Sequence, residues 1–119
     1  MTVTAQEMVA AAKQQITEID VAAAQGRLAG SVVLDVREPA EYAAGHLPGA
    51  VNIPRGMLEF KIDSLAPLQG NQQAGMVVYC QTGGRSALAT LVLNDMGYSG
   101  AVSMAGGFKA WAESGLSVE

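Results

Sequence analysis

One stretch of the chain, residues 76–97, reads MVVYCQTGGRSALATLVLNDMG and joins a strand pattern to a helix pattern. Residues 76–79 form a short apolar run with two central valines, which favours a buried parallel strand. Gly83 and Gly84 then turn the chain into a helix that we predict over residues 85–96. A buried strand that leads through a glycine turn into a helix is typical of an α/β domain.

The remaining chain alternates strand and helix patterns in the same way. Further strands are predicted at residues 16–19, 31–36, 50–53 and 101–104. Further helices are predicted at residues 4–15, 21–28, 39–44 and 107–113, and residues 55–68 combine helix and loop. This order predicts a mainly parallel sheet, in which ligand sites lie beyond the carboxyl ends of the strands. Cys80 stands at such an end.

The composition suits one domain and excludes several classes of function. The chain has 119 residues, of which 50% are hydrophobic and 15% charged, so it is long and apolar enough to bury a single core. The formal net charge is −4, and the 7 Lys and Arg residues are scattered along the chain. Without a cluster of cations to neutralise phosphates, the chain is not expected to bind nucleic acid.

Cysteine content and hydropathy restrict the setting in which the protein works. Its single cysteine, Cys80, excludes an internal disulfide and a zinc site built on paired cysteines. The apolar stretches are far shorter than the ~20 residues that a membrane helix needs. Residues 1–15 lack the cationic start and apolar core of a signal peptide. We therefore expect a soluble, cytoplasmic protein that makes no membrane contact.

The loop after the central strand has the features of a site for a nucleophilic thiolate. Gly83 and Gly84 allow successive N–H groups to converge on one point, and the following helix adds the partial positive charge of its N-terminus. Arg85 can add a full positive charge to the same cup. These effects favour the thiolate of Cys80, the nucleophilic form of cysteine, and an anion bound beside it. A buried core cysteine is the alternative, but the turn, the arginine and the helix start favour a functional thiol.

Four motifs in this order resemble those of the rhodanese-homology domain of single-domain sulfurtransferases. They are LDVREPAEY at residues 34–42, GHLPGAVNIP at 45–54, the loop from Cys80 to Ser86, and Gly97-Tyr98 followed by MAGGFKAW at 104–111. The resemblance covers about residues 16–115. It implies an α/β, rhodanese-like fold with a central, mainly parallel sheet of about five strands flanked by helices. Residues 16–119 are expected to form this domain, and residues 1–15 a helical extension that packs on it.

The resemblance also implies sulfur transfer in two half-reactions. Cys80 would take the outer sulfur of a small anionic donor such as thiosulfate, become a persulfide, and pass the sulfur to cyanide or a thiol. The loop residues that would hold the persulfide and the donor's oxygens are Gln81, Thr82, Gly83, Gly84, Arg85 and Ser86. They would do so through backbone amides, assisted by the arginine charge. Such covalent catalysis needs no metal and no organic cofactor.

Three other functions are weighed against this one. Phosphatases and arsenate reductases with a catalytic cysteine have five residues between that cysteine and their arginine. Only four residues lie between Cys80 and Arg85, and the shorter loop suits a sulfur atom better than a phosphate group. A non-catalytic binding module is disfavoured by the presence of the cysteine itself. A persulfide carrier that a partner protein loads in a sulfur relay would use the same thiol, and it stays open.

Other polar residues near the predicted site have structural interpretations. His46, the single histidine, precedes a strand and is expected to make structural hydrogen bonds rather than to act as a base. Asp35 and Arg37 end a strand on the same side of the sheet as the thiol, where they form either an ordinary ion pair or a brace for the active-site loop. Glu38 and Glu41 are expected on the solvated face of a short helix.

Overall fold

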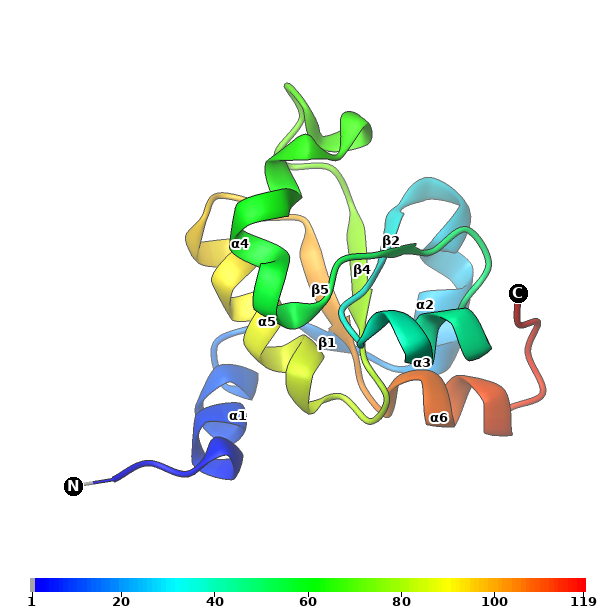
Figure 1. Cartoon of the computed structure of the whole chain (residues 1–119), viewed down its shortest axis with the longest axis horizontal. Helices are drawn as coiled ribbons and strands as arrows, with labels where there is room; N and C mark the ends of the chain where they lie inside the picture. Colours follow the sequence, from blue (N-terminus) through cyan, green and yellow to red (C-terminus); the bar gives the residue numbers. More distant parts are fainter. Residues whose placement is uncertain (1) are drawn as a thin grey trace.

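A five-stranded parallel sheet forms the centre of the computed structural model, which describes residues 2–119 (Figure 1). Its strands are β1 (Glu18–Ile19), β2 (Val32–Asp35), β3 (Val51–Asn52), β4 (Met76–Tyr79) and β5 (Ala101–Met104). They lie in the order β1-β5-β4-β2-β3, and each neighbouring pair runs parallel. The predicted α/β class and parallel sheet are confirmed. Because β4 is the central strand, Cys80 lies at the middle of the carboxyl edge of the sheet.

Helices cover both faces of this sheet. They are α1 (Ala5–Lys13), α2 (Val21–Arg27), α3 (Pro39–Ala44), α4 (Leu58–Lys61), α5 (Gly84–Asp95) and α6 (Gly107–Glu113), with short 3-10 turns after α2 and around α4. α4 and α5 lie over one face, and α2 and α6 lie over the other (Figure 1). Cover on both faces explains why β4 is an unbroken run of buried, mainly apolar residues rather than an alternation with polar ones.

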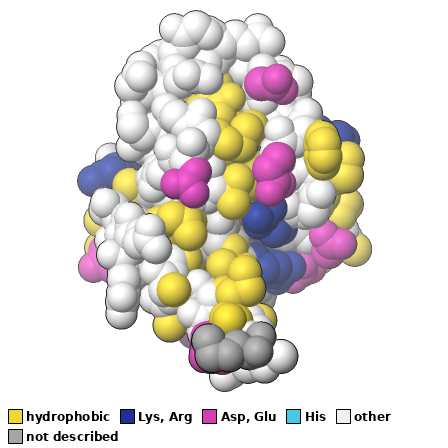
Figure 2. Space-filling model, turned by 90° about the vertical axis from the view of Figure 1, so that its left-hand side faces the viewer, with side chains coloured by type: hydrophobic (Ala, Val, Ile, Leu, Met, Phe, Trp, Pro, Cys, Tyr) yellow, Lys and Arg dark blue, Asp and Glu magenta, His cyan; other side chains and the backbone are white. Residues whose placement is uncertain are grey.

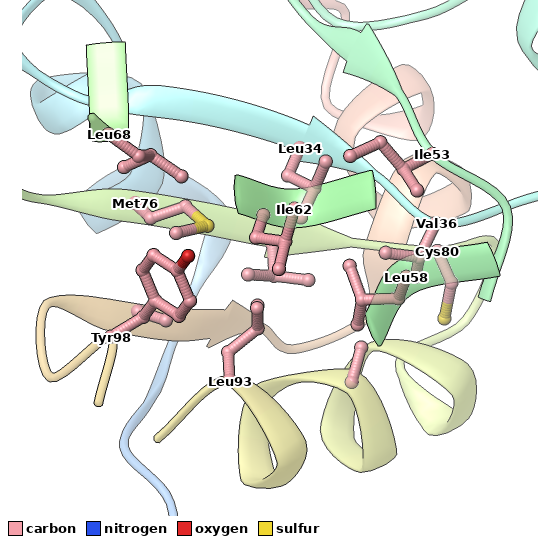
Figure 3. Close-up of a cluster of buried hydrophobic side chains, with 13 residues drawn as sticks. Leu34, Val36, Ile53, Leu58, Ile62, Leu68, Met76, Cys80, Leu93 and Tyr98 are labelled. Carbon is pink, nitrogen blue, oxygen red and sulfur yellow. The ribbon is translucent and has the colours of Figure 1, made fainter. Parts of the chain in front are cut away.

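Successive residues of β4 contribute to two separate cores, because strand side chains alternate between the faces of a sheet. Val78 packs in the cluster under α4 and α5, together with Leu93. Val77 packs in the opposite cluster, together with Trp111 of α6. Figure 3 shows the first cluster, with Cys80 at one end of it. The thiol is therefore continuous with the hydrophobic core on one side and with the carboxyl edge of the sheet on the other.

The elements differ from the prediction mainly at their ends. α5 begins at Gly84 rather than at Arg85, because Gly83 takes a left-handed conformation with φ of 110° and forms the N-cap. β2 and β3 are shorter than the predicted strands, since only residues 32–35 and 51–52 pair with their neighbours. The positions of these elements along the chain agree with the prediction.

The N-terminal helix, α1, packs on the rest of the chain. Its start is closed by a capping box, in which Thr4 Oγ1 accepts the N–H of Glu7 at 3.1 Å and Glu7 Oε1 accepts the N–H of Thr4 at 3.0 Å. α1 lies against α5, and a Cβ placed on Gly84 would lie 3.7 Å from Val9. The helix therefore lies beside the start of α5. Within residues 2–119, no helix combines the length and the hydrophobicity that crossing a membrane requires.

Candidate active site

Cys80 lies at the carboxyl end of β4, where the sequence predicted the site. Its side chain is 1% exposed, and its Sγ accepts a hydrogen bond from the N–H of Gly83 at 3.1 Å. The sulfur also lies 3.6 Å from the hydroxyl oxygen of Ser86, to which the thiol donates. Gly83 has the left-handed conformation that a side chain would strain. The glycine turn therefore directs an N–H group at the sulfur.

The start of α6 holds the backbone of the loop in place. The N–H of Phe108 donates to the carbonyl of Cys80 at 2.8 Å, and the N–H of Lys109 donates to the carbonyl of Gln81 at 3.1 Å. Gly107 permits this close approach, because a Cβ there would lie 2.5 Å from the Cys80 carbonyl oxygen. The carbonyl groups of Cys80 and Gln81 are therefore occupied by N–H donors of α6. The first N–H groups of α5, by contrast, have no acceptor within their own helix and can bind another group. The loop is therefore suited to binding an anion.

Arg85 and Glu41 form an ion pair at one side of the loop. The guanidinium and the carboxylate meet through two hydrogen bonds, Nη1 to Oε1 at 2.8 Å and Nη2 to Oε2 at 3.1 Å. Glu41 keeps the partial exposure expected of a solvated helix face, but it also pairs with Arg85, because the start of α5 lies next to α3 in the folded chain. These hydrogen bonds lower the pKa of Glu41 to about 2. They also raise the pKa of Arg85, to which the charge of nearby Cys80 adds a smaller contribution.

The sequence predicted that the charge of Arg85 acts on the anion-binding loop around Cys80. The structure adds a partner for Arg85, the carboxylate of Glu41. Arg85 follows the cysteine in the same loop, but its guanidinium makes its direct hydrogen bonds to the carboxylate of Glu41. Sequence spacing could not indicate this pairing, since the two residues lie on different helices.

A second ion pair, between Asp35 and Arg37, is buried beside the loop. The two residues are 0% and 2% exposed, and Arg37 Nη2 lies 2.7 Å from Asp35 Oδ2. The hydroxyl of Tyr79 donates to the same oxygen at 2.8 Å. Burial raises the pKa of Tyr79, so this phenol keeps its proton at neutral pH and remains a donor. A buried ion pair needs such additional hydrogen bonds, because both charges have lost their water.

Arg37 also reaches the active-site loop. Its Nη1 donates to Oε1 of Gln81 at 3.2 Å, and its Nη2 donates to the carbonyl of Gly45 at 2.7 Å. The guanidinium lies over the ring of Phe108, 4.4 Å from the centroid. Of the two interpretations that the sequence left open, the contacts therefore favour the brace. They also show that Gln81, predicted to bind substrate through its amide, uses its side chain to anchor the loop.

Ser103 of β5 is a neighbour of the site that the sequence analysis missed. Its Oγ lies 2.9 Å from the Oγ of Ser86, and both residues are 0% exposed. Ser86 also donates to the carbonyl of Gly83 at 3.2 Å. One signal could have found Ser103, since it is the single hydroxyl residue within the apolar run 101–104. Thr82, by contrast, is exposed on the loop.

His46 lies apart from these contacts. The His46 ring stacks on Tyr42 with centroids 3.8 Å apart, and its Nδ1 lies 3.0 Å from the Tyr42 carbonyl, which fits the predicted structural role.

A cavity of about 420 Å³ lies away from the cysteine loop, at the amino ends of β2 and β4, where Val32 and Gly75 line it. Its lining has no charged side chain, so we assign no chemistry to it. The described part of the chain contains no group of three His, Cys, Asp or Glu side chains placed to hold a metal ion.

Comparison with known proteins agrees with the resemblance of the motifs. Residues 12–114 match the family model of the rhodanese-like domain. The chain is 41% identical over 96 residues to the chloroplastic thiosulfate sulfurtransferase 16 of Arabidopsis thaliana, across 75% of this chain and 80% of that protein. It is 31% identical over 106 residues to a sulfurtransferase of Allochromatium vinosum, across 87% of this chain and 94% of that protein.

A solved structure extends the similarity to the full length of the chain. It is a protein of unknown function from Rhodopseudomonas palustris, described as a possible tyrosine phosphatase. The two structures superpose with a TM-score of 0.87 and 34% sequence identity, over 100% of this chain and 96% of the other. The family model covers far more than half of the sequence, and the cysteine loop lies within it. This chain belongs to the rhodanese-like domain family.

Proposed function

We propose that this protein is a sulfurtransferase that carries sulfane sulfur on Cys80 as a persulfide. It takes the sulfur from a small anionic donor such as thiosulfate and passes it to cyanide or a thiol. The observation that carries this proposal is the single cysteine at the end of β4, with the Gly83 N–H 3.1 Å from its sulfur. The relatives named as sulfurtransferases support the same activity.

In the first half-reaction the Cys80 thiolate forms a bond to the outer sulfur of thiosulfate. The sulfur–sulfur bond of the donor breaks, and its electron pair leaves with sulfite. The N–H of Gly83 stabilises the thiolate before the attack. The N–H groups at the start of α5 stabilise the persulfide anion and the donor's oxygens. No proton has to move, so this step needs no base, in keeping with the structural contacts of His46.

In the second half-reaction the acceptor attacks the outer sulfur of the persulfide. Cyanide becomes thiocyanate, and a thiolate becomes a persulfide. The Cys80 thiolate leaves with the electron pair of the broken bond and is ready for another donor. The backbone contacts between the loop and α6 keep the same N–H groups around the sulfur through both half-reactions. The cycle uses no oxidant and no second thiol, which suits a chain with one cysteine.

Two other functions would use the same thiol. A persulfide carrier loaded by a partner protein would need Cys80 and its loop but no thiosulfate site. A phosphatase is suggested by the description of the Rhodopseudomonas protein. It would need room for a phosphate group, which the four residues between Cys80 and Arg85 do not favour. A reducing compartment such as the cytoplasm suits either sulfur function, because the thiol has to stay free.

Intact-protein mass spectrometry before and after incubation with thiosulfate tests the proposal. We expect the wild type to gain the mass of one sulfur atom, and cyanide to remove it. The Cys80→Ser variant should gain nothing, since no other thiol exists to hold the sulfur. A free, alkylatable thiol that gains no sulfur would overturn the thiosulfate reaction and favour loading by a partner protein. Release of phosphate from an aryl phosphate by the wild type, lost in Cys80→Ser, would favour the phosphatase.

A further inference from the structure

Arg85 is the one charged side chain within the active-site loop, and its charge is opposed by a carboxylate at the surface. The side chains of Arg85 and Glu41 are 39% and 34% exposed, so the pair lies where a dissolved ligand could reach it. The two guanidinium–carboxylate hydrogen bonds measure 2.8 and 3.1 Å. An anion that approaches the loop therefore meets a cation that already has a partner.

The position of Glu41 is determined by its own helix as well as by Arg85. Glu41 is the third residue of α3, and its Oε1 accepts the N–H of Glu38 at 3.0 Å in a capping box. The carboxylate is thus held from two sides, by the start of α3 and by the start of α5. Its lowered pKa of about 2 keeps it ionised in mild acid as well as at neutral pH. It is a constant negative charge beside the site.

No other cation near the loop takes over the attraction of anions that Glu41 weakens at Arg85. Arg37 is buried and paired with Asp35. Lys109 is exposed at the start of α6, where water and salt screen its charge. Figure 2 shows the face that carries α1 and α5, on which acidic and basic side chains lie close together rather than in areas of one sign. With Arg37 buried in its own pair and Lys109 screened, a dianion such as thiosulfate gains little from these two cations.

We propose that Glu41 is a specificity-determining residue that competes with anionic donors for Arg85. The site then selects sulfane sulfur donors of lower negative charge, such as the monoanions of alkanethiosulfonates, over the dianion thiosulfate. The Cys80 thiolate bonds to the outer sulfur of the thiosulfonate, the donor's sulfur–sulfur bond breaks, and its electron pair leaves with the sulfinate. This inference rests on the proposed sulfurtransferase function and names the donor class for it.

The rate of persulfide formation with thiosulfate and with methanethiosulfonate, followed by mass spectrometry, tests the inference. In Glu41→Gln we expect kcat/KM to rise roughly tenfold for the dianion and roughly threefold for the monoanion, because the released guanidinium of Arg85 attracts the dianion twice as strongly. The change should be in KM. Glutamine still accepts the N–H of Glu38, so the capping box is kept.

Glu59→Gln is the matched control, because it removes the same charge from a second exposed pair, Arg55–Glu59, with a hydrogen bond of 3.1 Å. It should change neither donor. A further arm combines Glu41→Gln with Arg85→Ala, in which the gain for thiosulfate should be much smaller, since no guanidinium is left to compete for. On the wild type itself, added salt should change the thiosulfate rate little, whereas an unopposed arginine would make it fall steeply.

The possible results separate this inference from the proposed function. If Glu41→Gln leaves the thiosulfate rate unchanged or lowers it, Glu41 orients Arg85 instead of competing for it, and the inference is wrong. An equal gain in Glu59→Gln would overturn it too, since net charge alone would explain the effect. If the wild type forms a persulfide with both donors, the proposed function stands whatever the variants do. If it forms one with neither, both proposals fail together.

Discussion

Two guanidinium–carboxylate pairs flank the active-site loop, and they differ in burial. Asp35 and Arg37 are removed from water, and Arg37 has further bonds to Gln81 and Gly45. The side chains of Arg85 and Glu41 are 39% and 34% exposed. Besides each other, their support is the hydrogen bond that Glu41 accepts from the N–H of Glu38 at the start of α3. A buried pair cannot lose one member without leaving an uncompensated charge, whereas water can replace either member of an exposed pair.

The difference indicates that the two arginines have different tasks. The buried pair connects the end of β2 to the loop and to α6, so it supports the shape of the site. The exposed pair contributes little to stability but lies where it can change the charge that a substrate meets. The same chemical group is thus structural in the buried pair and available for recognition in the exposed one.

Removal of the buried arginine should have the largest effect. Arg37→Leu leaves the Asp35 carboxylate buried without its cation, and we expect a loss of about 3–5 kcal/mol in the free energy of unfolding. Urea unfolding followed by circular dichroism measures it. Arg85→Leu serves as the control at the exposed pair and should lose no more than about 1 kcal/mol. Equal losses at the two sites would contradict the distinction between them.

A substitution at Gln81 separates the effect of the Arg37–Gln81 contact from that of the buried Asp35–Arg37 pair. Gln81→Leu removes the acceptor of Arg37 Nη1 and leaves the bonds to Asp35 intact. We expect a loss of about 1 kcal/mol in stability and a fall of about tenfold in the rate of persulfide formation, because the loop loses its anchor. Gln81→Glu keeps an acceptor for Arg37 and should retain most of the rate. If Gln81→Leu transfers sulfur as fast as the wild type, the side chain does not position the loop.

Buried hydroxyl groups allow the same comparison between side chains without charge, one with a hydrogen-bond partner and one without. Ser103→Ala removes the partner of the Ser86 hydroxyl and should cost about 1 kcal/mol. The matched control is Thr90→Val on α5, because the buried Oγ1 of Thr90 has no hydrogen-bond partner within residues 2–119. That substitution should be neutral or slightly stabilising. Denaturant unfolding of both variants provides the measurement, and a larger loss in Thr90→Val than in Ser103→Ala would contradict the assignment.

The smallest effect is expected from the exposed pair as the pH changes. The folded pKa of Glu41, about 2, is below its ordinary value of 4.5. The ionised carboxylate therefore stabilises the fold above pH 4.5, and this contribution disappears as the pH falls towards 2. Glu41→Gln should be less stable than the wild type by under about 1 kcal/mol at neutral pH, and the two should converge in acid. A difference that stays constant with pH would mean that the charge of Glu41 does not contribute.

Much of the fold could be predicted from local patterns. The strands at residues 76–79 and 101–104 and the helix at 107–113 have the predicted bounds, since short apolar runs and glycine turns mark where such elements begin and end. The helix at residues 39–44 also agrees, with Pro39 in its first turn and Gly45 after its end. The place of Cys80 followed from the same patterns, because a residue that ends a buried strand before a helix lies at the carboxyl edge of a parallel sheet.

The partners of the side chains around the thiol were decided only by the tertiary structure. The contacts between Glu41 and Arg85 and between Arg37 and Gln81 each join residues 44 positions apart, and Ser103 comes from a further strand. By itself, the sequence determined the order of the elements, the strand-end thiol and the glycine turn beside it, because these depend on residues close together in the chain. Which arginine is buried and which one meets a carboxylate depends on how β2, α3 and the loop come together at the edge of the sheet. That geometry is set by packing of the two cores, and no local pattern contains it.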